Sequence, residues 1–547
     1  MKKALYLASA CLLAIAFSSC EKELENPRKG ANDFNTFYTN ATADDADKLI
    51  AQAYNTYFGG PEEVQKQNFF EIISDDMDCG GGTYSDNANR YRNADELTCQ
   101  PSDWLFHGPW RGYSLYQTIY VCIYQCNLII DKIPDSNDAE INRVKAEAKF
   151  LRALNLFEAM RVWHNPPFAD HIYTAEDMLA PNGDPKEMID WILENFDDAA
   201  KALPAVPAKG QQAKIGGRAT SGAALAFYAK AALWYGTQYN DNAYVQKAIA
   251  PLKSVINSGL YGLIPDVADL FRVKADFCEE YIFERCCAET GADKSLQNDN
   301  RQTWRSFRAD NMFIPKGFMG YGWAFCNPTK EFVDFMKEHD GETNPRFNAK
   351  LLSYDQLMEM EYNDADKGIK PGAAYPNCVG YWNATCLMYN DDLYTDTGGN
   401  FYSRANNPII RYAEVLLMYA EAQFLANGDS DKSGLAALNQ VRERSKLAPL
   451  AALDMQAIID ERRAELFCEN ERWFDIIRWR IADKVLANAG THRYTFFGYK
   501  PGTTEYWIDD NEFSKGEGKG WDDKYWNLPY GDNQLTANPN LVQHPGW

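Results

Sequence analysis

Apolar residues recur along most of this chain at intervals of three and four positions, the spacing of one face of an α-helix. Turn signals such as Pro134 and the pair Asn427 and Gly428 separate the periodic segments. The pattern predicts helices over residues 44–57, 113–133, 140–163, 185–203, 220–235, 243–257, 411–426, 434–445 and 455–479. The last of these has a candidate break near Asn470. The chain is therefore expected to fold as successive helical pairs.

The helical pairs set the predicted fold class. Residues 220–235 are very rich in alanine, and a stripe of small residues lets two helix axes approach closely. Several pairs span about 35 to 45 residues, the period of a tetratricopeptide-like array, although the strict repeat consensus is absent. The fold is therefore predicted to be mostly α, with tetratricopeptide-like helical pairs forming an α-α superhelix.

Two long segments lack this period. Residues 261–405 carry many Gly, Asn, Asp, Tyr and Trp residues, and residues 481–547 are aromatic and polar. We expect long loops and short strands in the first segment and packed loops in the second. Extended irregular segments inside a folded body are usually functional.

The N-terminus has the pattern of an export signal. Lys2 and Lys3 precede an apolar run over residues 4–17, and small serines lead into Cys20. A run of about 14 apolar residues is too short to span a ~30 Å hydrocarbon core. A cysteine at this place is typical of a bacterial lipoprotein, whose thiol is acylated after cleavage. We expect a signal peptide over residues 1–19 and a lipidated Cys20 that begins a tether over 20–40. The alternative is an ordinary secreted protein, because Phe17 fits the cleavage pattern poorly.

The amino-acid composition limits the classes of molecule that the protein is expected to bind. The net charge of −22 argues against nucleic acid, whose phosphates require a basic patch, and against broad contact with anionic membranes. An acidic, aromatic-rich surface suits neutral ligands such as sugars. Eleven cysteines follow Cys20, so they cannot all pair within one chain, and some disulfides remain possible. With only six histidines and no Cys-x-x-Cys pair, a zinc site has little support.

Paired carboxylates are the possible basis for catalysis, because glycoside cleavage needs two of them about 5–9.5 Å apart. The candidates are Glu414, Glu421, Glu461, Glu465 and Glu469. Arginines lie among them at ion-pair spacing, which favours a structural charge network. The sequence has no Gly-x-Ser-x-Gly elbow, phosphate-binding glycine loop or His-Glu-x-x-His motif. We therefore expect that the protein is not an enzyme.

Aromatic residues in irregular segments are the better candidates, because sugars stack flat C–H faces on indole and phenol rings. The candidate ligand-binding residues are Asp76, Tyr84, Arg90 and Trp104 in one segment and Trp304, Arg308, Tyr321 and Trp323 in another, with Trp382 further along. A packing role is the alternative for any single one. Asp75, Asp76 and Asp78 offer oxygen ligands for Ca²⁺, and a solvated turn is the competing interpretation. No other metal and no cofactor is expected.

Several helical segments together resemble the SusD/RagB family of outer-membrane nutrient-binding lipoproteins. The matching segments are residues 146–157, 161–167, 218–220, 410–422, 437–442, 459–466, 472–479 and 538–546. They follow the family's order over nearly the whole mature chain. Acidic Glu21, Glu23 and Glu25 after the cysteine also resemble members displayed on the cell surface.

The resemblance implies one SusD-like domain over residues 41–547. Its parts would be helical pairs at 41–260 and 406–480, a loop-rich ligand-binding face at 261–405 and C-terminal loops at 481–547. It implies a non-catalytic, lipid-anchored outer-membrane receptor, facing the cell surface, that binds oligosaccharide or polysaccharide and covers a SusC-like TonB-dependent transporter. A peptide ligand, a glycoside hydrolase and a helical adaptor for protein partners are the alternatives. The family's matching segments are scaffold, so the ligand-binding candidates rest on aromatic content and placement alone.

Overall fold

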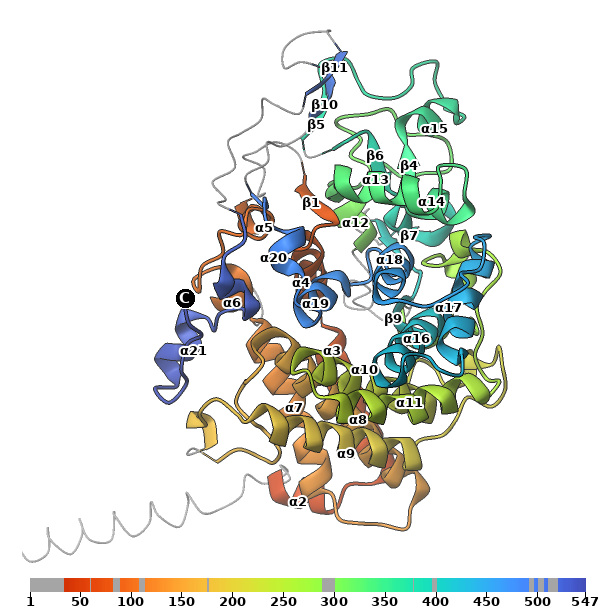
Figure 1. Ribbon diagram of the computed structural model, residues 1–547. Coiled ribbons are helices and arrows are strands. Elements are labelled where there is room, and N and C mark those ends of the chain that lie inside the picture. The colour runs from red at the N-terminus through yellow and green to blue at the C-terminus, as the bar shows by residue number, and fades with distance from the viewer. Residues whose placement is uncertain are drawn as a thin grey trace, which may run out of the picture.

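Stacked helices form most of the described part of the chain and occupy the lower half of Figure 1. The computed structural model describes residues 34–59, 61–81, 89–107, 114–174, 177–287, 301–376, 378–395, 401–490, 496–499, 506–509 and 520–547. The predicted signal peptide, Cys20 and most of the predicted tether lie outside these residues. None of the helices in the described ranges combines the length and apolar character needed to cross a membrane.

The elements fall into three sets. The helices of the first half are α2 (Phe34–Thr39), α3 (Ala43–Phe58), α4 (Pro61–Ile72), α5 (Asn89–Asp95), α6 (Trp104–His107), α7 (Leu115–Lys132), α8 (Ala139–Trp163), α9 (Pro185–Ala202), α10 (Ser221–Gln238) and α11 (Asn242–Asn257). Those of the second half are α12 (Arg301–Arg305), α13 (Lys330–His339), α14 (Pro345–Lys350), α15 (Tyr354–Glu359), α16 (Tyr412–Asn427), α17 (Ser433–Arg444), α18 (Met455–Glu465), α19 (Arg472–Arg478), α20 (Ala482–Val485) and α21 (Asp532–Ala537). The strands are β1 (Met77–Gly80), β2 (Tyr281–Arg285), β3 (Phe325–Pro328), β4 (Leu351–Ser353), β5 (Ala374–Pro376), β6 (Tyr381–Asn383), β7 (Leu393–Thr395), β8 (Phe401–Ser403), β9 (Asn407–Arg411), β10 (Phe496–Tyr499) and β11 (Tyr506–Asp509).

The mostly helical fold class is confirmed, and each predicted helix is present with its ends shifted by at most a few residues. The predicted break is also present: α18 ends at Glu465, α19 begins at Arg472, and Asn470 between them has φ +63°. Among the helices of ten or more residues, the pattern missed α4 and α13. In α4 the polar Asn68 and Glu71 are buried beside apolar neighbours, which removes the amphipathic signal. Helix α13 is short and lies inside the segment expected to form loops and short strands.

Helix α10 carries the alanine stripe and lies at the centre of the stack. It packs against α9 and α11 on either side of it in the chain and against α16 from the second half. Ala223, Ala226, Ala229 and Ala232 are all fully buried. Because alanine occupies so little space, three helices can approach the same axis, as the sequence predicted.

The segment between α11 and α16 is an insertion into the helical stack. Helix α11 packs directly on α16 although about 150 residues separate them in the chain. Strands β2 and β9, near the two ends of this insertion, pair antiparallel, with Tyr281 opposite Arg411. The insertion therefore leaves and rejoins the stack at one place, and its loops, short helices and small sheets form the upper part of Figure 1.

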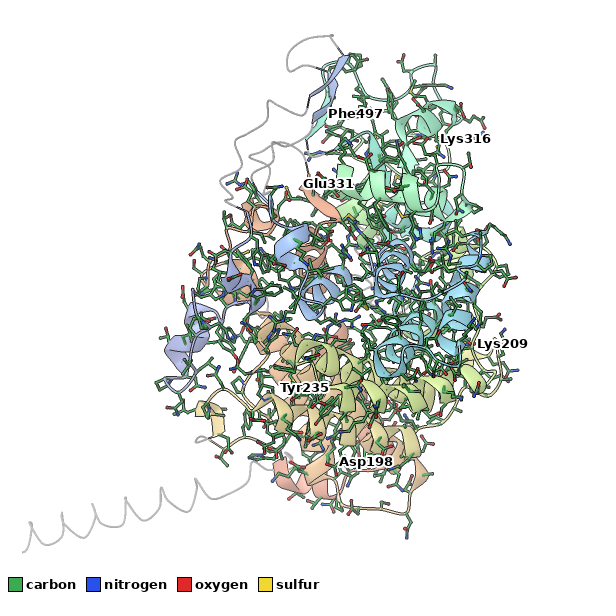
Figure 2. The ribbon with its side chains drawn as sticks, viewed as in Figure 1. Asp198, Lys209, Tyr235, Lys316, Glu331 and Phe497 are labelled. Carbon is green, nitrogen blue, oxygen red and sulfur yellow. The ribbon has the colours of Figure 1, made fainter. Side chains whose placement is uncertain are left out.

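The insertion has a hydrophobic core of its own. Phe307, Leu357, Tyr375 and Trp382 are buried together there with Phe497 of β10, which Figure 2 labels in the upper part of the molecule. Trp382 is fully buried, and its ring contacts Tyr375 and Phe497 edge-on. Its suggested role in sugar binding is therefore wrong, because burial in this core leaves no ring face for a ligand.

A buried ion network joins the insertion to the helices. The guanidinium of Arg411 contacts Glu280 at 2.7 Å, Glu465 at 2.7 Å and Glu469 at 2.6 Å. Arg346 of α14 reaches the other oxygen of Glu465 at 3.0 Å. Arg346, Arg411, Glu280 and Glu465 are almost completely buried. Surrounded by arginines, Glu465 has a pKa well below its usual range although burial acts to raise it.

The other glutamates considered for catalysis are also paired. Glu414 lies 2.9 Å from Lys230, and Glu421 accepts a hydrogen bond of 2.8 Å from Arg478. Glu461 is bonded to Arg346 and Arg442. The interpretation of these carboxylates as a structural charge network is confirmed.

Enlarging the alanine stripe should destabilise the fold. In Ala229→Leu the added methyl groups must displace neighbouring helices, so we expect the free energy of unfolding to fall by about 1–3 kcal/mol. The matched control is Ala250→Leu on the exposed side of α11, which should leave stability unchanged. Chemical unfolding followed by circular dichroism measures both. Equal stability of the two variants would contradict the close packing of α10.

Candidate functional site

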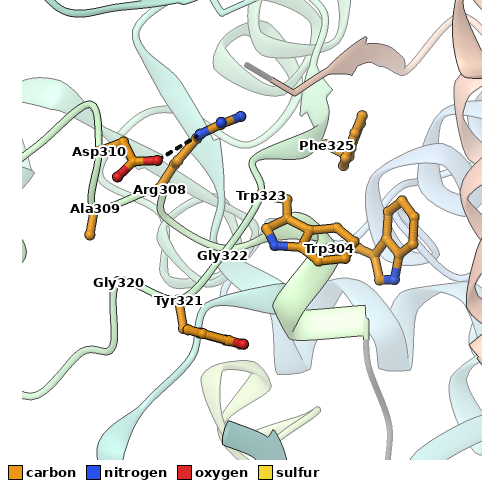
Figure 3. Close-up of a pocket in the computed structure, with 9 residues that line it drawn as sticks. All are labelled: Trp304, Arg308, Ala309, Asp310, Gly320, Tyr321, Gly322, Trp323 and Phe325. Atoms are coloured by element: carbon orange, nitrogen blue, oxygen red, sulfur yellow. Dashed lines mark ion pairs between the residues drawn. The ribbon is translucent and has the colours of Figure 1, made fainter. Parts of the chain in front are cut away.

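Four of the aromatic and charged candidates meet in one pocket of about 420 Å³ in the insertion. The lining residues are Trp304, Arg308, Ala309, Asp310, Gly320, Tyr321, Gly322, Trp323 and Phe325 (Figure 3). They come from two short segments, α12 with the turn after it and the chain leading into β3. The pocket therefore depends on how these two segments pair.

Backbone hydrogen bonds hold the two segments together. The Gly322 amide donates to Phe307 O at 2.8 Å, and the Trp323 amide donates to Thr303 O at 2.8 Å. Gly322 allows this approach, because a Cβ there would lie 2.2 Å from the carbonyl oxygen of Ser306. The pairing places Trp323 beside Trp304, and Tyr321 lines the same pocket.

Three of the aromatic rings, those of Trp304, Trp323 and Phe325, form one cluster. The Trp304 ring lies 4.6 Å from the Trp323 ring and 5.3 Å from the Phe325 ring, measured between centroids. Trp323 is 44% exposed and Tyr321 is 42% exposed. Large aromatic side chains are usually buried inside a protein. Two exposed rings in one pocket therefore indicate a binding surface.

Polar groups stand beside these rings. The Arg308 guanidinium lies 3.6 Å from the Asp310 carboxylate, which is 84% exposed, and Figure 3 shows the pair at the rim. The backbone beneath them is fixed, because Lys370 donates to Ala309 O at 2.6 Å and Tyr375 donates to Arg308 O at 3.1 Å. The pocket thus offers flat rings with a hydrogen-bond donor and an acceptor at one edge, which suits an uncharged ligand rich in hydroxyl groups.

The structure brings together Trp304, Arg308, Tyr321 and Trp323, as the composition of this segment predicted. Trp104 lies behind the pocket: its ring contacts Tyr91 edge-on at 6.0 Å, and Tyr91 contacts Trp304 at 5.9 Å. Tyr84 lies outside the described residues. Arg90 belongs to α5, but its side chain lies outside the described part. Whether any of these residues binds a ligand stays a prediction.

Two lining residues were missed. Phe325 begins the buried strand β3 and reads in the sequence as an ordinary core residue. Asp310 lies two positions after Arg308 in a turn that is closed by a hydrogen bond of 3.0 Å from the Asn311 amide to Arg308 O. The sequence Arg308-Ala309-Asp310-Asn311 contains the Asp and Asn residues typical of turns, which was the available signal.

The prediction that Asp76 binds the ligand is wrong. Its carboxylate is 2% exposed and accepts a hydrogen bond of 2.7 Å from Arg463, so it is not open to a ligand. Neighbouring Asp75 receives two hydrogen bonds of 2.7 Å from Arg472. Although burial opposes ionisation, Arg472 and Arg463 hold the pKa of Asp75 well below its usual range. Both carboxylates serve to anchor the segment to α18 and α19.

The calcium interpretation fails for the same reason, as does the solvated turn. Arg463 and Arg472 already supply the positive charge that a cation would bring to Asp75 and Asp76. Burial, together with the charges of Asp95 and Glu331, raises the pKa of Asp78. Across the described ranges, no three acidic, histidine or cysteine side chains are grouped closely enough to hold a metal ion.

Stacked helices interrupted by an insertion that carries an aromatic pocket define a binding scaffold, and comparison with known proteins identifies the family. A sequence profile described as "SusD family" matches residues 279–547, and one described as "Starch-binding associating with outer membrane" matches residues 40–233. The two matches together cover most of the chain. The protein belongs to the SusD family.

Relatives are similar over most of their length. A SusD-like protein of Bacteroides ovatus is 24% identical over 521 residues, which is 88% of this chain and 84% of that protein. SusD-like protein P25 of Formosa agariphila is 25% identical over 391 residues, or 67% of this chain and 70% of that protein.

Solved structures share the fold. One described as a laminarin binding SusD-like protein has a TM-score of 0.71 at 24% identity and covers 92% of this chain and 99% of that one. Surface glycan-binding protein A from Bacteroides thetaiotaomicron, solved in complex with laminarihexaose, has a TM-score of 0.68 at 19% identity with the same coverage.

The separate roles of two aspartates can be tested by the same substitution. Asp76→Asn removes the charge that Arg463 contacts at 2.7 Å and leaves the half-buried Arg463 only Asp75 at 3.1 Å, so we expect the free energy of unfolding to fall by about 1–3 kcal/mol. Asp310→Asn at the exposed rim is the matched control and should leave stability unchanged. Urea unfolding followed by tryptophan fluorescence measures both. Full stability of Asp76→Asn would refute the anchoring role.

Proposed function

We propose that this protein is a non-catalytic glycan-binding lipoprotein of the outer membrane, facing the cell surface, which captures oligosaccharide in the aromatic pocket. The single observation that carries the proposal is the pair of exposed rings, Tyr321 and Trp323, beside Trp304 in one pocket. A sugar ring presents a flat C–H face to such rings and hydroxyl groups to a neighbouring donor and acceptor. Arg308 and Asp310 are placed to serve as that donor and acceptor.

The size and charge of the pocket support an uncharged sugar ligand. Its volume of about 420 Å³ falls in the usual range for small-ligand sites. The charges of Arg308 and Asp310 balance each other, so the rim gives no net attraction to an anionic or a cationic ligand. Two of the similar solved structures are described as a laminarin binding protein and a complex with laminarihexaose, and one matching family profile is described as starch-binding, which supports a glycan as the ligand.

The carboxylates argue for binding without catalysis. A glycosidase needs one carboxyl group that donates a proton and a second that acts as base or nucleophile. Glu414, Glu421, Glu461 and Glu465 are buried and paired with lysine or arginine, away from the pocket. Within the described lining only Asp310 carries a carboxylate, so a pair is lacking there.

Delivery is the second half of the proposal. We infer that lipid on Cys20 holds the receptor at the outer membrane, where it covers a SusC-like TonB-dependent transporter and passes captured sugar into it. A short tether raises the effective concentration of receptor and transporter for each other, so their contact need not be tight on its own. Family membership and the cysteine after an apolar N-terminal run support this role.

Removing an exposed ring should weaken sugar binding. For Tyr321→Ala and Trp323→Ala we expect at least about a tenfold rise in Kd, because each loses a stacking surface in the pocket. The measurement is isothermal titration calorimetry with neutral oligosaccharides, including laminarihexaose and starch fragments. Tyr124→Ala is the matched control, because Tyr124 is also 42% exposed but lies on α7.

Three results would contradict the site or the ligand class. Unchanged affinity in both pocket variants would remove the site assignment, and loss of affinity in Tyr124→Ala would show that the effect is not local. Absence of binding to every glycan, with binding to a peptide library, would favour the peptide receptor. Cleavage of a bound oligosaccharide would favour the hydrolase.

The anchor has its own test. Cys20→Ala should abolish membrane retention and leave oligosaccharide affinity unchanged, since the acylated thiol lies far along the chain from the pocket segments. The matched control is Cys11→Ala, which alters a cysteine in the preceding apolar run and should leave retention intact. Membrane fractionation with immunoblotting measures both. Retention of the Cys20→Ala variant would refute the lipid anchor.

A further inference from the structure

A group of buried sulfur atoms lies directly behind the pocket wall. Arg305 follows Trp304 in α12, and Cys326 follows Phe325 in β3. In each pair the first residue lines the pocket and the second is almost fully buried. The guanidinium of Arg305 faces Cys326 and two further cysteines from distant parts of the chain.

Those two cysteines are Cys386 and Cys468, whose Sγ atoms lie 3.9 Å apart. Cys386 ends a 3₁₀ turn, η6 (Ala384–Cys386), in the insertion, and Cys468 lies in the turn between α18 and α19 of the scaffold. They are 1% and 4% exposed and 82 positions apart in the chain. No backbone segment has to move for the two sulfur atoms to be neighbours, because the fold already places them together.

Their surroundings favour the nucleophilic form of a thiol. Arg305 donates to Cys468 Sγ at 2.8 Å and lies 3.8 Å from Cys386 Sγ, and Asn383 donates to Cys468 Sγ at 3.0 Å. A guanidinium beside a thiol stabilises the thiolate, the form that attacks disulfides. The hydrogen bond from Cys468 and the charge of Arg305 lower the pKa of Cys386.

Glu71 is the acidic neighbour of this group. Burial raises the pKa of Glu71 to about 8, while the charge of Arg305 acts to lower it. The Asn470 amide donates to the Glu71 carboxylate at 2.6 Å. Glu71 can therefore supply a counter-charge to Arg305 when the two sulfur atoms are oxidised.

We propose that Cys386 and Cys468 are joined by a disulfide when the chain folds in a compartment that contains a protein disulfide oxidant. The Cys386 thiolate attacks the oxidant's disulfide, forms a mixed disulfide and releases one oxidant thiolate. Cys468 then loses its proton and attacks the Cys386 sulfur, which releases the second oxidant thiolate. The two protein thiols are oxidised, the oxidant disulfide is reduced, and the protons complete its dithiol. Both sulfur atoms are buried in the finished fold, so the oxidant must reach Cys386 while Cys386 already lies beside Arg305 within the insertion and the segment around Cys468 has yet to pack.

The bond would fix the pocket to the scaffold. The turn η6 contacts α12, which carries Trp304, and also α14 and β4. Cys468 belongs to the helical part of the molecule. A covalent link between them removes conformational freedom from a long loop of the unfolded chain and ties the wall that holds Trp304 to α18.

A second cysteine pair provides an internal control. Cys122 and Cys126 are both fully buried on α7, and their separation of four residues places them on one face of that helix. The neighbours of Cys122 are Asn155 Nδ2 at 3.2 Å and the Ala53 carbonyl at 3.5 Å. Bridging two residues within one rigid helix would distort it, so we expect these two thiols to stay reduced.

The test is a thiol map of the whole protein. The chain is exported to the periplasm of a Gram-negative host with a standard signal sequence and purified without reductant. It is then denatured with iodoacetamide, digested and analysed by mass spectrometry. We expect a linked peptide pair joining Cys386 to Cys468, with Cys122 and Cys126 alkylated. Alkylation of both Cys386 and Cys468, or a link from either to Cys326, would overturn the proposal.

Variants give a second readout. Dithiothreitol should lower the Tm of the exported wild-type protein and of Cys326→Ser, the matched control in the same sulfur group. It should leave the Tm of Cys386→Ser unchanged. An equal shift in all three would overturn the proposal, and the wild-type thiol map decides it independently if a variant fails to fold. Neither readout involves a glycan, so the result is separate from the proposed binding function.

Discussion

The buried contact between Arg411 and Glu465 is the constraint on which the arrangement of the molecule depends. Removing a charge from water costs several kcal/mol even after the protein relaxes, so each buried group must find its partner in good geometry. Arg411 has such partners in Glu280, Glu465 and Glu469, and Arg346 takes the second oxygen of Glu465. These residues come from β9, α18, the turn after α18, α14 and the chain before β2. One set of ion pairs thus fixes where the insertion leaves the helices and where it returns.

This junction explains how loops can carry a defined pocket. The insertion between α11 and α16 is anchored at its base by the β2–β9 pairing and by the ion network. The interior of the insertion is a separate hydrophobic core around Trp382. Beneath the pocket, hydrogen bonds from Arg305 to Asn68 and Cys468 connect α12 to the first half of the chain and to the end of α18. The exposed rings of Tyr321 and Trp323 therefore stand on a rigid support.

The helices were predictable because their information is local. A period of three and four residues, an alanine stripe and a break near Asn470 can be read within a short window. The candidates Trp304, Arg308, Tyr321 and Trp323 were found by a similar local signal, aromatic content in a segment without period. The prediction of Asp76 as a ligand-binding residue was wrong because its partner Arg463 is 387 positions away in the chain. No local pattern predicts that contact. The proximity of Cys386 and Cys468 has the same origin in tertiary structure.

We propose that the rings of Trp304, Tyr321 and Trp323 form the sugar-binding surface. A crystal structure with a bound neutral oligosaccharide tests it most directly. We expect a sugar ring stacked on Trp323 or Tyr321, with its hydroxyl groups within hydrogen-bond distance of Arg308 or Asp310. A well-ordered oligosaccharide bound elsewhere, with this pocket empty, would contradict it.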